Sequence, residues 1–283
     1  MIKMKTAVSL FTIALCMGCT SKIKEKKDEI YSRHLQKHIA LDIISTSVPD
    51  NKSDFNLLLL NDGQDVEKLK VKDAVDSLFK KKLIQPLIVV AIKTSDRMQE
   101  YGVGGNPDYQ GNGTSAQKYS DFIINELLPF VKKRAGVRKF NTVNIAGSSL
   151  GGLSAFDIAW DHADKINKVG VFSGSFWMRD KDASDPTYSD DKNRIIIDKI
   201  RSSRKRPKLK YWFYAGGNEE NADRDKDGIS DVIDATKDLV DLIKKKKVCP
   251  PEDIIYTEIK EGKHDYDSWS KVFPQFLIWA VGK

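Results

Sequence analysis

The 283-residue sequence predicts an α/β fold in which a mostly parallel central sheet is covered by helices on both faces. Short apolar runs alternate with amphipathic stretches along the chain, and no proline-rich linker divides them. Hydrophobic residues make up 40% and charged residues 31% of the chain. This composition fits a globular domain and excludes a disordered chain or a multi-span membrane protein.

The expected strands are runs of aliphatic and β-branched residues: 39–44, 55–60, 87–92, 142–146, 168–172, 209–215 and 254–259. The runs at 57–60 and 86–92 are continuously apolar, as expected for strands with helices on both faces. The expected helices are the amphipathic stretches 66–82, 116–134, 150–162, 229–247 and 269–281. The alternation predicts one domain over residues 36–283.

The beginning of the chain has the pattern of an export signal over residues 1–18. Lys3 and Lys5 form a basic region, and the apolar run 7–17 is too short to span a bilayer. The run ends just before Cys19, which resembles a lipoprotein signal in which this cysteine is lipidated and becomes the mature N-terminus. The alternatives are an ordinary secretory signal and a buried N-terminal helix. We therefore expect an exported protein anchored by lipid to a bacterial membrane.

The next segment, residues 19–35, is rich in charge and is expected to form a tether between the lipid and the domain. The net charge of the whole chain is +7. The other basic runs are scattered at expected element ends without interleaved aromatic residues: 80–82, 204–206 and 244–247. We expect solvated faces there and no nucleic-acid partner.

A G-x-S-x-G pattern runs from Gly147 to Gly151 and places Ser149 between an expected strand and an expected helix. Glycines on both sides allow a turn tight enough to lift the serine hydroxyl above the end of the sheet. The N–H of Leu150, at the start of the helix, would then point toward a developing oxyanion. This context predicts that Ser149 is a nucleophile.

A serine nucleophile needs a base, and the base needs an acid that orients it. His264 follows the last expected strand, whereas the remaining histidines occupy less suitable positions: His34, His38 and His162. Glu219 follows an earlier strand and is the first choice for the acid, with Glu220 and Asp223 as competitors that spacing alone does not separate. The second oxyanion donor is expected in the loop 61–64, although its Asn-Asp-Gly sequence also suits a plain turn.

Six blocks in order, NLLLLNDGQ, DRMQEYG, GSSLGG, VFSGSFW, YAGGNEE and GKHDYDSW, resemble a family of esterases. The family includes esterase D, enterochelin esterase-like enzymes, feruloyl esterases and mycolyltransferases. The resemblance extends from about Ile39 to the C-terminus and implies the α/β-hydrolase fold.

The resemblance also implies roles for individual residues. Ser149 matches the nucleophile, His264 the base and Glu219 the acid, which is often Asp in the family. The backbone N–H of Gln64 matches the second oxyanion donor. The resemblance implies that two tryptophans, Trp177 and Trp269, line the substrate pocket. The alternative is that they are ordinary core residues.

An acidic loop follows Glu219. Its carboxylates alternate and precede a glycine, as in calcium loops of the D-x-D-x-D-G type. The candidate ligands are Asp223, Asp225, Asp227, Asp231 and Asp234. The alternative is a polar turn before a helix, because a helix N-terminus favours acidic residues. A bound Ca²⁺ would be structural, and catalysis itself is expected to need no cofactor.

Taken together, the motifs predict a serine carboxylic-ester hydrolase that acts through a Ser-His-Glu triad and an acyl-enzyme. The expected substrates are siderophore, feruloyl or acetyl esters outside the cytoplasm. Two alternatives remain open: an acyltransferase of the same fold, and a catalytically silent, lipid-anchored protein that binds a glycan or a siderophore.

Overall fold

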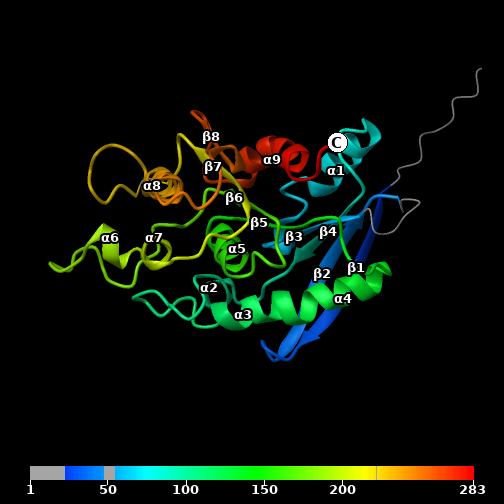
Figure 1. Cartoon of the computed structure of the whole chain (residues 1–283), viewed down its shortest axis with the longest axis horizontal. Coiled ribbons are helices and arrows are strands. Elements are labelled where there is room, and N and C mark those ends of the chain that lie inside the picture. The colour runs from blue at the N-terminus through cyan, green and yellow to red at the C-terminus, as the bar shows by residue number, and fades with distance from the viewer. Residues whose placement is uncertain (1–22, 48–54, 221) are drawn as a thin grey trace, which may run out of the picture.

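The computed structural model describes residues 23–47, 55–220 and 222–283. Its centre is an eight-stranded sheet in the order β1-β2-β4-β3-β5-β6-β7-β8 (Figure 1). The strands are β1 (Lys24–Ser32), β2 (Lys37–Ser45), β3 (Asn56–Leu60), β4 (Leu87–Ile92), β5 (Val143–Ser148), β6 (Lys168–Phe172), β7 (Lys210–Gly216) and β8 (Ile254–Ile259). From β4 to β8 every neighbouring pair is parallel, and β1 and β2 form an antiparallel edge. The mostly parallel sheet predicted from the sequence is confirmed.

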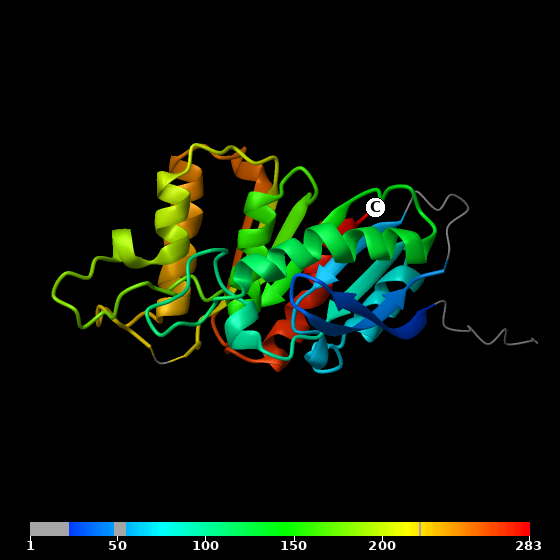
Figure 2. The ribbon, with the colours of Figure 1, turned by 90° about the horizontal axis from the view of Figure 1, so that it is seen from below.

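Helices cover both faces of this sheet (Figures 1 and 2). The helical segments are η2 (Gly63–Asp65), α1 (Val71–Lys80), α2 (Arg97–Glu100), α3 (Ala116–Phe122), η3 (Ile123–Leu127), α4 (Leu128–Ala135), α5 (Leu150–Asp161), α6 (Asp190–Asn193), α7 (Ile195–Ser202), α8 (Asp231–Lys245), η4 (Pro251–Asp253) and α9 (Tyr266–Val281). Helices α1 and α9 share one hydrophobic core with the sheet, and α3, α4, α5, α7 and α8 share the other.

Strand β3 shows why its sequence is continuously apolar. Leu57 and Leu59 lie in one core, and Leu58 and Leu60 lie in the other. Successive side chains of a strand point to opposite faces, so a strand between two helical layers needs apolar residues at every position.

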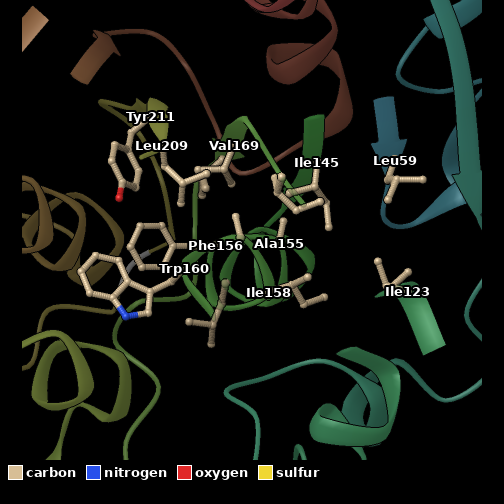
Figure 3. Close-up of a cluster of buried hydrophobic side chains, with 14 of the residues drawn as sticks. Leu59, Ile123, Ile145, Ala155, Phe156, Ile158, Trp160, Val169, Leu209 and Tyr211 are labelled. Atoms are coloured by element: carbon tan, nitrogen blue, oxygen red, sulfur yellow. The ribbon is translucent and has the colours of Figure 1, made fainter. Parts of the chain in front are cut away.

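Helix α5 packs at the centre of the larger core, against β5 and β6. Figure 3 shows Phe156 and Trp160 of this helix beside Val169 and Tyr211 of the sheet. Residues 150–160 are all buried. The helix that begins next to Ser149 is therefore held firmly on the sheet.

The predicted tether is wrong from Lys24 onward. Strand β1 pairs with β2 along its whole length, from Lys24 opposite Ser45 to Ser32 opposite Lys37. Its charged side chains are mostly exposed, which suits an edge strand because charge discourages pairing with another chain. The predicted signal over residues 1–18 and the lipidated Cys19 lie outside the described residues. Among the helices of the described ranges, none is long and apolar enough to cross a membrane.

Candidate active site

Ser149 lies on a sharp turn between β5 and α5 at the carboxyl end of the sheet. Its backbone has φ 53° and ψ −125°, a conformation that few residues other than glycine adopt. A Cβ at Gly147 would collide with the backbone of Gly151, which explains the first glycine of the motif. Ser149 is only partly buried, and its Oγ lies 3.3 Å from Ser175 Oγ. The turn therefore presents the hydroxyl as the motif predicts.

The structure joins Glu219 and His264. Glu219 Oε2 lies 2.7 Å from His264 Nδ1, and Glu219 Oε1 accepts hydrogen bonds from Gly216 N–H (2.6 Å) and Ser173 Oγ (2.5 Å). The side chain of Glu219 is 0% exposed, so these contacts replace the water that a carboxylate requires. A buried carboxylate on Nδ1 fixes the direction of the imidazole and leaves Nε2 for chemistry.

The competing acids occupy different positions. Glu220 is 46% exposed, and its Oε1 lies 3.4 Å from His264 Nε2, on the opposite side of the ring from Glu219. Asp223 accepts hydrogen bonds from Asp227 N–H and Gly228 N–H within its own loop. Of the three carboxylates that spacing left open, only Glu219 has the geometry of an orienting acid.

Ser149 and His264 both follow strands at the carboxyl end of the sheet. Ser149 follows β5, Glu219 follows β7 and His264 follows β8. In the part of the chain that the structure describes, no hydrogen bond joins Ser149 Oγ to His264 Nε2. The loop after β6 contacts both the acid and the nucleophile: Ser173 donates a hydrogen bond to Glu219, and the hydroxyl of Ser175 lies beside that of Ser149. The hydrogen bond between a nucleophile and its base is often long or absent without substrate and forms when substrate binds.

Trp269 does not line the cleft beside Ser149, which corrects its predicted role. It is 4% exposed, and its indole N–H donates to Ser173 Oγ at 2.9 Å. Its ring lies edge-to-face with the imidazole of His264, with 5.2 Å between the ring centroids. Trp269 therefore supports the acid and the base from behind.

The loop after β3 is fastened to the Ser149 turn. Asn61 Nδ2 donates to Gly151 O at 2.8 Å, and Tyr119 OH donates to Asn61 Oδ1 at 2.8 Å. Leu150 begins α5, and Gln64 lies in η2 with its side chain exposed. The backbones of both predicted oxyanion donors are thus on elements that meet at this turn.

The site also contains three residues that were not predicted from the sequence: Asp62, Arg97 and Tyr101. Arg97 Nε donates to Asp62 Oδ1 at 2.9 Å, Arg97 Nη2 donates to Ser148 O at 3.3 Å, and Asp62 N–H donates to Tyr101 OH at 2.9 Å. Burial raises the pKa of Asp62, and the charge of Arg97 opposes that rise. The signal available was the DRMQEYG block, which contains both Arg97 and Tyr101.

A cleft of about 350 Å³ opens beside Ser149. Trp177, one of the two predicted pocket tryptophans, lines it together with Tyr109, Arg97 and Arg179. The cleft therefore offers apolar rings and positive charge within one site.

The acidic loop brings part of the predicted calcium set together. Carboxylate oxygens of Asp223, Asp225 and Asp227 lie within 4.8 Å of one another. Asp231 is instead paired with Arg224, at 2.6 Å from Nη1. Desolvation raises the pKa of Asp234, and the charges of Asp227 and Asp225 raise it further. Three of the five predicted ligands therefore lie close together, whereas Asp231 is paired with Arg224. Calcium binding stays a prediction.

Calcium is expected to raise the melting temperature relative to EGTA, because a ligand that binds only the folded state stabilises it. At about 100 times its Kd the gain is about 2.7 kcal/mol, or roughly 5 °C or more for a domain of this size. Thermal unfolding measured with Ca²⁺, Mg²⁺ and EGTA checks this. Asp225→Asn should abolish the shift, and Asp164→Asn, a change at an exposed aspartate elsewhere, should keep it. Equal melting temperatures in Ca²⁺ and EGTA would contradict the prediction.

Comparison with known proteins identifies the family. The family model described as "Putative esterase" matches residues 35–280. The uncharacterized protein YbbA of Bacillus subtilis (strain 168) is 23% identical over 236 residues, which cover 81% of this chain and 86% of that protein.

Solved structures share the fold. A ferulic acid esterase has a TM-score of 0.67 at 18% identity, over 92% of this chain and 98% of that one. The enterochelin esterase of Shigella flexneri has a TM-score of 0.68 at 21% identity, over 90% of this chain and 57% of that one. These similarities confirm the predicted α/β-hydrolase fold. The chain belongs to the Putative esterase family and is a carboxylic ester hydrolase.

Proposed function

We propose that the chain hydrolyses carboxylic esters through a serine nucleophile and an acyl-enzyme. His264 takes the proton of Ser149 as the hydroxyl attacks the ester carbonyl, and Glu219 stabilises the imidazolium that forms. The N–H groups of Leu150 and Gln64 stabilise the oxyanion, where one donor contributes about 2.7–4 kcal/mol to the transition state. Water then releases the acyl group. The observation that carries the proposal is the contact of the buried Glu219 with His264, at the same carboxyl end of the sheet as the Ser149 turn.

Labelling with a fluorophosphonate tests the proposal directly. An activated serine forms a covalent adduct, and mass spectrometry of the peptide that contains Ser149 locates it. Absence of an adduct would favour the alternative of a silent binding protein. An acyltransferase would also be labelled, and it is distinguished by transfer of the acyl group to an alcohol acceptor in competition with water.

The substrate is proposed to be a siderophore, feruloyl or acetyl ester. Solved structures of similar fold include a ferulic acid esterase and an enterochelin esterase, which support the first two classes. Parallel assays with enterobactin, feruloylated xylan and acetylated sugars separate the three classes. No metal or organic cofactor takes part in the proposed chemistry.

The chain is further proposed to be exported and anchored to a bacterial membrane through lipid on Cys19. The support is the sequence before this residue, a basic region followed by a short apolar run. In cells fed a labelled fatty acid, the full-length protein is expected to carry the label and to sediment with membranes. Cys19→Ala should lose both properties, whereas Cys249→Ala should keep them. Label on the Cys19→Ala protein would exclude this anchor.

A further inference from the structure

Arg179 lies in the loop after β6 and lines the same cleft as Ser149. Its backbone is fixed, because its carbonyl accepts a hydrogen bond from Tyr109 N–H and it forms an isolated antiparallel bridge with Arg194. Its guanidinium lies over two aromatic rings, 5.7 Å from the centroid of Tyr109 and 6.0 Å from that of Tyr188. These contacts hold the cation in place before any ligand arrives.

The hydrogen-bonding capacity of this guanidinium is not satisfied within the protein. Arg179 Nε is buried and has no hydrogen-bond partner in the described part of the chain. Five other arginines of the described residues pair with acids: Arg97 with Asp62, Arg134 with Asp28, Arg194 with Asp238, Arg201 with Asp191, and Arg224 with Asp190 and Asp231. No ion pair of Arg179 occurs among the described residues. A buried donor left without a partner costs about 1–3 kcal/mol. The terminal nitrogens of Arg179 have no hydrogen-bond partner among the described residues either, and these are the atoms that a ligand in the cleft can reach.

The nearby acids are engaged by their own loops. Asp108 lines the cleft, but its Oδ1 accepts from Gln110 N–H and Asn112 N–H and its Oδ2 accepts from Asn112 Nδ2. Asp182 Oδ1 accepts from both the N–H and the hydroxyl of Ser184. Neither carboxylate forms an ion pair with Arg179, so the cation remains available to an anion that enters the cleft.

We propose that Arg179 binds an anionic group of the ester substrate and makes the enzyme selective for acidic esters over neutral ones. The group is a carboxylate, or another anion with planar or tetrahedral oxygens, linked to the ester by an apolar spacer. Trp177 and Tyr109, which line the same cleft, provide the surface for that spacer. Arg179 would act on specificity, while Ser149 and His264 perform the chemistry. The inference rests on the proposed function and adds a substrate class to it.

Two matched pairs of esters test the proposal and locate the anion. For the acyl side, p-nitrophenyl hydrogen glutarate carries a terminal carboxylate, and p-nitrophenyl valerate has the same carbon count without it. For the alcohol side, 4-acetoxybenzoate is compared with the neutral 4-acetoxybenzamide. Wild type should have the higher kcat/KM for the acidic ester in the pair whose carboxylate lies on the side of the ester that Arg179 contacts. Arg179→Gln should lower kcat/KM for that ester by about 10- to 100-fold and leave its neutral partner nearly unchanged.

Two further variants serve as controls. Arg138→Gln removes an equal charge from an exposed position and should leave the ratio of each pair unchanged. Arg179→Lys keeps the charge but loses the planar donor pair, so it should restore part of the preference. The neutral esters report whether each variant is folded and active. The proposal would be overturned if wild type showed no acidic preference in either pair, or if Arg179→Gln lowered kcat/KM equally for both members of the pair that shows the preference.

Binding to the Ser149→Ala variant separates this proposal from the proposed function. Two pairs of compounds are titrated calorimetrically into that variant, with and without Arg179→Gln: monoethyl glutarate with ethyl valerate for the acyl side, and 4-acetoxybenzoate with 4-acetoxybenzamide for the alcohol side. Tighter binding of the acid that disappears with Arg179→Gln supports the anion subsite even if no ester is turned over. Equal binding of acid and neutral compound in both pairs, together with normal hydrolysis by wild type, rejects the subsite and keeps the esterase function.

Discussion

Replacement of Ser149 by alanine is expected to lower kcat for p-nitrophenyl esters by about 10⁶-fold while the protein stays folded. The reaction requires an oxygen that attacks the ester carbonyl, and in the proposed mechanism only the hydroxyl on the Ser149 turn supplies it. The substitution removes one oxygen atom, and helix α5 remains anchored by its buried side chains. Initial rates, circular dichroism and thermal unfolding of the two proteins check both parts of this expectation.

Ser175→Ala is the matched control for that experiment. Its hydroxyl lies 3.3 Å from that of Ser149 and Ser175 is itself 2% exposed, but it has no acid–base pair directed at it. Losing a neutral hydrogen bond of this kind costs about 0.5–1.5 kcal/mol, so we expect a decrease in kcat/KM of about tenfold or less. If Ser149→Ala kept turnover similar to that of Ser175→Ala, Ser149 would not be the nucleophile.

The central strands and the serine turn could be predicted because their causes are local. Strands β4 and β6 have the ranges that the apolar runs predict, because strands enclosed by helices on both faces consist mostly of apolar residues. Strand β8, at the edge of the sheet, also has its predicted range. The turn at Ser149 has glycines where the backbone leaves no room for a Cβ. In both cases the constraint falls on residues adjacent in the sequence.

Other features could not be predicted because their causes lie far away in the chain. Strand β1 resembles a solvated tether in composition, and only its pairing with β2 makes it a strand. The ion pair between Arg97, at the start of α2, and Asp62 joins residues 35 positions apart. The choice of Glu219 over Glu220 depends on which of two adjacent carboxylates turns inward toward Gly216 N–H, and spacing does not contain that information.

Glu219→Gln is expected to lower kcat by about 10³- to 10⁴-fold, although the new side chain has nearly the same shape. The amide oxygen can still accept from Gly216 N–H and Ser173 Oγ. The amide nitrogen then faces His264 Nδ1 and donates to it, which forces the imidazole proton onto Nε2. In that tautomer Nε2 cannot accept the proton of Ser149, and the positive charge formed in the transition state loses its carboxylate.

Glu220→Gln provides the comparison that identifies the acid. Glu220 is largely solvated and lies at Nε2, on the side of the ring that must release its contact for catalysis, so we expect a change in kcat/KM of about threefold or less. Both variants remove one negative charge from adjacent positions, and their difference therefore reports the position of the carboxylate rather than net charge. Steady-state kinetics at several pH values, with thermal unfolding to exclude a folding defect, make the comparison. If the two variants lost activity equally, the position of the carboxylate would not matter and Glu219 would not be the orienting acid. If Glu220→Gln lost more, the orienting acid would be Glu220, and the imidazole would have turned to place its other nitrogen toward Ser149.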